Sequence, residues 1–271
     1  MFARSSDHQS YSRIARRLGA CLWLLLAATV GGSCGHSHET HYVDVALRTE
    51  AVEQATVTDL GYAVTFTEAR FAIRDLLFTQ NGEAHMAVLQ RLSNWLVPEA
   101  HAHPGHNHGG DITGEAQGRW VVSFLDSGTS FAIGTLAEGD YDAADVRYTV
   151  ADEELVDAAD PLFGASVLLA GSATRDEETV SFTVRLTYDD GALVAGVAFD
   201  ATVRLGSNVW LSFLPYDPLS DAHLMDGVDF LALAEGDTVA LDGTGEAGSA
   251  LRARLLTHDH LLFEERFVGL D

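Results

Sequence analysis

The chain has 271 residues, with 40 acidic and 16 basic side chains and a formal net charge of −24. Such an acidic protein repels phosphate backbones, which argues against nucleic-acid binding. Its hydrophobic content of 47% supports a sizeable core rather than a disordered acidic chain. The unusual feature is the presence of twelve histidines, and their positions carry the functional argument.

The N-terminus has the order of a secretory signal peptide. Four arginines precede an apolar run over residues 18–30, too short to cross a membrane stably, and small residues lead to Cys34. Gly32-Ser33-Cys34 resembles a bacterial lipoprotein signal, in which the cysteine is lipidated and becomes the mature N-terminus; Gly31 departs from the apolar residue preferred there. We expect residues 1–34 to hold this signal. The alternative is an ordinary secretory signal with an incidental cysteine.

Removal of the signal would change both the charge and the available chemistry. The remaining chain has 12 arginines and 39 acidic residues, a net charge of −27. No cysteine follows Cys34, so the mature chain offers no disulfide framework, thiolate metal site or cysteine nucleophile.

After a polar lead over residues 35–41, the chain has the period-two pattern of β-strands. Asn81-Gly82 predicts a hairpin leading into residues 85–92. A short helix is predicted over residues 226–233, with Asp226 as its cap. The predicted strands are residues 62–66, 71–75, 120–125, 146–150, 180–188, 193–205 and 209–214.

Short strands separated by Gly- and Asp-rich turns predict an all-β fold, an antiparallel β-sandwich of immunoglobulin-like type over residues 42–271. Tyr141, at a corner between two strands, is expected to return its hydroxyl to a backbone group across that corner. One long loop, residues 98–118, interrupts the strand pattern. The prediction is one sandwich with an inserted His-rich loop.

The loop holds four histidines within eight residues: His101, His103, His106 and His108. Neutral imidazole binds Zn(II), Cu(II) and Ni(II) well. Each His-x-His pair directs both rings to one side in extended chain, and Pro104-Gly105 supplies a turn between the pairs. Asp111 and Glu115 are candidates for an oxygen ligand or for orienting a ring. The alternatives are a solvated loop that binds metal adventitiously and a pH-responsive element.

Two smaller histidine groups are further candidate ligands. His36, His38 and His41 follow the lipidation site, where they either join the loop site, form a separate chelator or belong to an unstructured tether. His258 and His260 lie in a predicted last strand, in which spacing of two places both rings on one face; an exposed strand face explains them equally well. The isolated His85 and His223 are expected to be ordinary polar or partly buried residues.

The loop sequence carries a resemblance to known proteins. His-x-His-Pro-Gly-His from His101, followed by Gly-Asp-x-x-Gly-Glu ending at Glu115, resembles a motif of uncharacterised His-rich bacterial lipoproteins, and residues 61–69 resemble their opening sheet region. The resemblance covers about a quarter of the mature chain and implies metal binding in the cell envelope. A looser similarity to copper-binding lipoproteins of methanobactin and methane-oxidation systems raises copper as a candidate.

Other motifs do not support catalysis. His38-Glu39-Thr40-His41 is one residue short of the zinc-protease motif His-Glu-x-x-His. Residues 243–248 match Gly-x-Gly-x-x-Gly, but only 23 residues follow, so a glycine hairpin loop is predicted rather than a dinucleotide site. A calcium loop does not fit the spacing of four aspartates, which are expected to form a solvated acidic face; these are Asp217, Asp221, Asp226 and Asp229.

The sequence therefore predicts a membrane-anchored lipoprotein of the bacterial cell envelope, not an enzyme, that captures, buffers or delivers Zn, Cu or Ni through its His-rich loop. Zn or Cu is the leading metal; Cu(I) is less favoured, because only Met86 and Met225 supply soft ligands. Its expected partners are the metal ion, the membrane and an envelope transporter or receptor. The alternative is an envelope interaction module that binds a protein or glycan.

Overall fold

The computed structural model describes residues 40–52, 55–80, 111–217 and 221–267. Of these residues, 58% lie in strands and 9% in helices, so the predicted all-β class is confirmed. The chain divides into two units, Met1–Thr40 and His41–Asp271. Apart from Thr40, the described residues belong to the second unit.

The elements of the described residues follow the chain in a fixed order. The strands are β1 (Tyr42–Thr49), β2 (Ala55–Val57), β3 (Ala63–Gln80), β4 (Asp111–Ser123), β5 (Ser130–Ala137), β6 (Gly139–Tyr148), β7 (Val167–Arg175), β8 (Glu178–Leu186), β9 (Leu193–Val203), β10 (Ser207–Phe213), β11 (Tyr216–Asp217), β12 (Ala222–His223), β13 (Thr238–Leu241) and β14 (Leu261–Phe267). The helices are α3 (Phe230–Leu233), α4 (Gly245–Arg254) and the 3-10 helix η1 (His258–His260).

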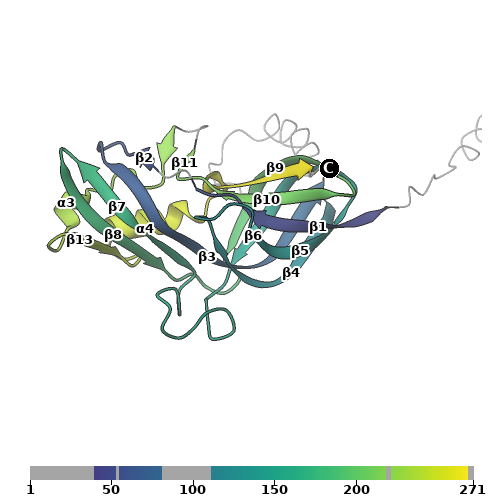
Figure 1. Ribbon diagram of the computed structural model, residues 1–271, viewed down its shortest axis with the longest axis horizontal. Coiled ribbons are helices and arrows are strands. Elements are labelled where there is room, and N and C mark those ends of the chain that lie inside the picture. Colours follow the sequence, from purple (N-terminus) through teal and green to yellow (C-terminus); the bar gives the residue numbers. More distant parts are fainter. Residues whose placement is uncertain (1–39, 53–54, 81–110, 218–220, 268–271) are drawn as a thin grey trace, which may run out of the picture. The chain divides into compact units, whose positions relative to one another are not determined.

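The long strand β3 belongs to two parts of one sheet (Figure 1). Residues 63–71 of β3 pair with β7, and residues 73–79 pair with β6. Along its other edge, residues 70–80 pair with β4. Pairing then continues through β5, β1, β10, β14 and β9 to β6. Eight of the described strands thus form a closed ring, and β2, β7, β8 and β13 extend the sheet beyond it.

The predicted immunoglobulin-like, antiparallel sandwich is not confirmed. Three strand pairs in the described chain are parallel, namely β1 with β10, β8 with β13 and β9 with β14. Two seams in the ring are short, because β4 and β5 are in register at two positions and β9 and β14 at one. The halves that meet at these seams are β4-β3-β6-β9 and β5-β1-β10-β14. Alternation in sequence identifies the inward face of a strand, but it identifies neither the neighbour nor its direction.

Aromatic side chains fill the interior of the ring. Phe78, Phe199 and Phe263 come from β3, β9 and β14, and their ring centroids lie 5.4–5.9 Å apart. All three are at most 1% exposed, as expected for aromatic groups that pack edge to face. At the β4–β5 seam, a Cβ on Gly114 would lie only 2.6 Å from Leu136 Cγ. A side chain at this position would therefore push the two strands apart.

Four local predictions are wrong. The short helix begins later, at Phe230, because the Asp229 side chain rather than that of Asp226 accepts the N–H of Ala232. The glycine-rich segment does not form a hairpin loop but leads into α4. There Gly243 has φ +84°, and a Cβ on Gly248 would lie 3.1 Å from the Gly243 nitrogen. The third is the strand predicted over residues 258–260, which is η1. The fourth is the loop predicted over residues 98–118, because residues 111–118 lie in strand β4, paired with β3.

Candidate functional site

The His-rich segment connects two neighbouring strand ends. β3 ends at Gln80 and β4 begins at Asp111, and these two residues are register partners. Residues 81–110, which include His101, His103, His106 and His108, lie outside the described residues, as do His36, His38, Cys34 and the hairpin predicted from Asn81. The described structure therefore positions Gln80 and Asp111, which we call the attachment points of the His-rich segment. We call this end of the ring the proximal end.

His41 lies at the same proximal end. The N–H of Glu138, in the turn between β5 and β6, donates to the His41 carbonyl oxygen at 2.7 Å. β5 separates β1 from β4, because Leu136 is the register partner of both Val43 and Gly114. Two strand spacings amount to roughly 10 Å. The fold therefore brings the start of β1 close to the attachment points of the His-rich segment.

A row of polar side chains crosses β4, β5 and β1 beside these attachment points. Thr135 is the register partner of both Glu115 and Asp44, and all three are exposed. The Thr135 hydroxyl donates to Asp44 Oδ1 at 3.0 Å, while Gln117 Nε2 donates to Glu115 Oε1 at 3.0 Å. Sequence reasoning identified Glu115 and missed Asp44, whose only signal was its outward position in the alternating pattern of β1.

A hollow of about 250 Å³ adjoins the row. Tyr42 and Ile112 supply apolar walls, and Glu115 and Thr135 supply polar groups. Chemically, the lining of the hollow combines one carboxylate with two apolar side chains, a composition that suits a cation or an amphipathic group. The side chain of Asp111 lies outside the described residues, so its part in this hollow stays a prediction.

His258 and His260 lie at the opposite, distal end. The N–H of Leu214, which follows β10, donates to the His260 carbonyl oxygen at 2.9 Å, and β10 runs parallel to β1. β1 spans eight residues between the two ends, or roughly 23 Å at the usual rise. The structure therefore does not bring this pair together with His41 and Glu115.

The two distal histidines also differ from each other. His260 is 4% exposed, and its Nδ1 lies 2.9 Å from the Leu214 carbonyl oxygen. Burial lowers the pKa of His260 and outweighs the opposing effects of that bond and of nearby carboxylates. The His258 side chain is 43% exposed and contacts Asp259. A 3-10 turn separates residues two apart by about 120°, so the rings do not share a face as a strand would require.

The acidic segment near residue 226 is not simply a solvated face. Asp217 is 5% exposed. Asp226 accepts the N–H groups of Asp59 and His223, and Asp229 Oδ1 lies 2.5 Å from the Tyr62 hydroxyl. These carboxylates join the segment to the start of β3. The half-buried His223 agrees with its prediction as an ordinary polar residue.

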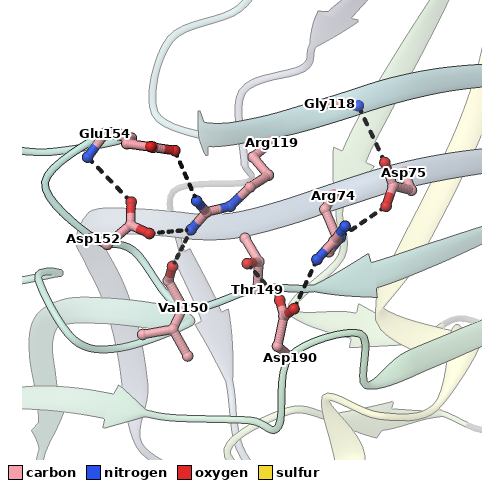
Figure 2. A network of polar contacts seen from close by, with 9 residues as sticks. All are labelled: Arg74, Asp75, Gly118, Arg119, Thr149, Val150, Asp152, Glu154 and Asp190. Atoms are coloured by element: carbon pink, nitrogen blue, oxygen red, sulfur yellow. Dashed lines mark hydrogen bonds and ion pairs between the residues drawn. The ribbon is translucent and has the colours of Figure 1, made fainter.

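A separate network of charges crosses the point where β3 changes partner (Figure 2). Arg74 on β3 and Arg119 on β4 are register partners. Arg74 donates to Asp75 at 2.8 Å and to Asp190 at 2.7 Å, and Arg119 donates to Asp152 at 2.7 Å. The hollow beside them has about 320 Å³. Because carboxylates already pair with both guanidinium groups, the network suits bracing of surface loops better than capture of an anion.

Asp75 occupies an irregular position in this network. Arg74 pairs with Arg119 and Leu76 with Ala116, so the single residue Asp75 lies opposite two residues of β4. Its φ of +43° is left-handed, and its Oδ1 accepts the Gly118 N–H at 3.2 Å. Burial raises the pKa of Asp75, but the hydrogen bonds from Arg74 and Gly118 and nearby arginine charges lower it overall. Sequence patterns do not reveal such a bulge.

Within residues 40–52, 55–80, 111–217 and 221–267, no group of three or more His, Cys, Asp or Glu side chains is arranged to hold a metal ion. In the same residues, no helix has the length and apolar character needed to cross a membrane. No protein-family model matches the chain, and neither the curated proteins nor the solved structures include a detectable match.

Proposed function

We propose that the chain is an exported lipoprotein that binds Zn(II), Cu(II) or Ni(II) through His101, His103, His106 and His108, for capture, buffering or delivery in the cell envelope. The observation that carries the proposal is the dense run of four imidazoles in the connection between two register-paired strand ends. Imidazole without thiolate suits these borderline ions.

The described part of the proximal end supports this proposal in two ways. Pairing of Gln80 with Asp111 holds the ends of the segment together, which lowers the entropy lost when its ligands converge. Glu115 and Asp44 place exposed carboxylates beside the attachment points. Their charge raises the local concentration of cations, and the imidazoles select among those cations.

Calorimetric titration of residues 35–271 with Cu(II), Ni(II) and Zn(II) tests the proposal. Replacement of the four loop histidines by alanine should weaken binding at least 100-fold, whereas the matched control His258→Ala should leave the affinity within about two-fold. Nitrogen hyperfine structure in the Cu(II) EPR spectrum should disappear only in the loop variant. Equal affinity of the loop variant and the parent would overturn the proposal and favour an interaction module with adventitious metal binding.

Export and lipidation form a separate part of the proposal. Labelled palmitate should enter the parent chain in a bacterial host and should not enter the Cys34→Ser variant. Incorporation into both chains, or into neither, contradicts lipidation at Cys34 without affecting the metal titration.

A further inference from the structure

Large apolar side chains are exposed around the proximal end of the ring. Among the described residues, three of the four most exposed are Leu205 at 76%, Ile112 at 61% and Tyr42 at 60%. Phe267, the last described residue of β14, is 49% exposed. Single exposed apolar residues are common and need no explanation, so the relevant question is whether these four belong to one surface.

A shared hollow, two hydrogen bonds and one strand pairing place the four residues along the same end of the ring. Tyr42 and Ile112 line the same hollow. In the turn before β10, the Leu205 N–H donates to Glu138 Oε1 at 3.3 Å, and the N–H of Glu138 donates to the His41 carbonyl oxygen. Phe267 pairs with Ser207, directly after that turn. We call Tyr42, Ile112, Leu205 and Phe267 the proximal rim.

The composition of the rim resembles that of a membrane–water interface. Tyr42 has an apolar ring and a polar hydroxyl, a combination that favours the headgroup region. Arg204 lies over the Phe267 ring, with its Cζ 4.7 Å from the centroid. Such an arginine keeps its charge near lipid phosphates while its stem and the ring contact apolar groups.

The length of the preceding chain favours a lipid surface over other occupants. Only residues 35–41 separate Cys34 from β1, and β1 begins at the rim. Seven extended residues reach at most about 25 Å. Acyl chains on Cys34 would therefore hold the proximal end, rather than the distal end, within that distance of the bilayer.

We propose that the proximal rim rests on the bilayer surface in the lipidated protein. This inference depends on the lipidation of Cys34 in the proposed function. Exposed carboxylates of Glu115 and Glu138 lie beside the rim, so the contact is shallow and favours zwitterionic over anionic lipids. The orientation directs the attachment points of the His-rich segment toward the membrane, where an integral transporter would lie.

Lipid quenching of a single fluorophore tests this orientation. The mature chain has no cysteine except the acylated Cys34, so Leu205→Cys and Phe267→Cys each provide one labelling site for an environment-sensitive dye. Leu256→Cys, next to the distal η1, is the matched control and is also partly exposed, at 36%. The labelled lipoproteins are placed in phosphatidylcholine vesicles that contain nitroxide lipids.

The proposal expects quenching at residues 205 and 267 at least three-fold stronger than at residue 256, and weaker quenching when half of the lipid is phosphatidylglycerol. Equal quenching at all three sites in protein that floats with the vesicles would overturn the rim proposal alone. If the dye at residue 205 is shielded from water but not quenched by nitroxide lipids, protein from this chain or from a second copy covers the rim. That result would also overturn the rim proposal. Protein that fails to float contradicts lipidation, and the rim proposal then fails with it.

Discussion

The Tyr141 hydroxyl lies 2.9 Å from the carbonyl oxygen of Ala137, four residues earlier, across the corner between β5 and β6. The same hydroxyl lies 3.1 Å from the Thr113 carbonyl oxygen on β4. The predicted corner tyrosine is therefore confirmed, and it joins three strands at the proximal end. Burial raises the pKa of Tyr141, so the hydroxyl keeps the proton that it donates.

Replacement of this hydroxyl should destabilise the protein. In Tyr141→Phe, the carbonyl oxygens of Ala137 and Thr113 lose the one O–H that they share, and we expect the free energy of unfolding to fall by about 1–2 kcal/mol. Urea unfolding followed by tryptophan fluorescence measures the change. Tyr42→Phe, at an exposed position, is the control and should change stability by less than about 0.5 kcal/mol. Equal effects of the two variants would contradict the corner assignment.

The bulge at Asp75 should depend on its carboxylate. Asp75→Ala removes the acceptor for Arg74 and Gly118 and places alanine at a left-handed φ, so we expect a loss of about 2 kcal/mol in unfolding free energy. Asp75→Asn keeps an acceptor and tolerates this φ, so it should lose less. Urea denaturation midpoints of the two variants measure this difference. An Asn variant as unstable as the Ala variant would show that the negative charge of Asp75, rather than its hydrogen-bond acceptors, stabilises the bulge.

Acid should weaken the fold through Asp160. Its carboxylate accepts two hydrogen bonds of 2.8 Å from Arg70, which lower its pKa below the ordinary value near 3.8. A depressed carboxyl pKa stabilises the folded state above the unfolded-state pKa, and this contribution is lost as pH falls through the folded-state value. Asp160→Asn should therefore destabilise the protein more at pH 7 than at pH 2.5.

Urea midpoints at both pH values measure that difference. Glu178→Gln, an exposed change on β8, serves as the control and should give nearly the same small effect at both pH values. A destabilisation by Asp160→Asn that does not depend on pH would show that packing, rather than the ion pair with Arg70, is responsible.

Metal affinity should fall when a candidate ligand at the proximal end is replaced, and should not change when one at the distal end is replaced. Glu115→Gln removes a carboxylate beside the attachment points of the His-rich segment, and we expect binding to weaken about ten-fold, as for groups that orient ligands. His258→Ala, at the distal end, should have no measurable effect. Calorimetry on both variants decides the matter, and the reverse order of effects would place the metal at the distal end.

Local sequence patterns predicted several features of the fold correctly. The strict alternation of β8 predicted a strand with one buried face, because period two leaves the remaining side chains in solvent. The position of Tyr141 predicted a corner because its partner lies only four residues away. The clustering of the four loop histidines is visible in the sequence because they are close neighbours along the chain. Their role in metal binding stays a prediction.

Contacts between residues far apart in the chain could not be predicted from the sequence. Asp44 and Glu115 flank Thr135 because β5 separates β1 from β4, and no local pattern encodes that order. No local pattern encodes the parallel pairing of β1 with β10 either. Nor does one show that Asp229, rather than Asp226, caps the short helix and contacts Tyr62. Local spacing specifies which side of a strand is buried, whereas strand order depends on packing of the whole core.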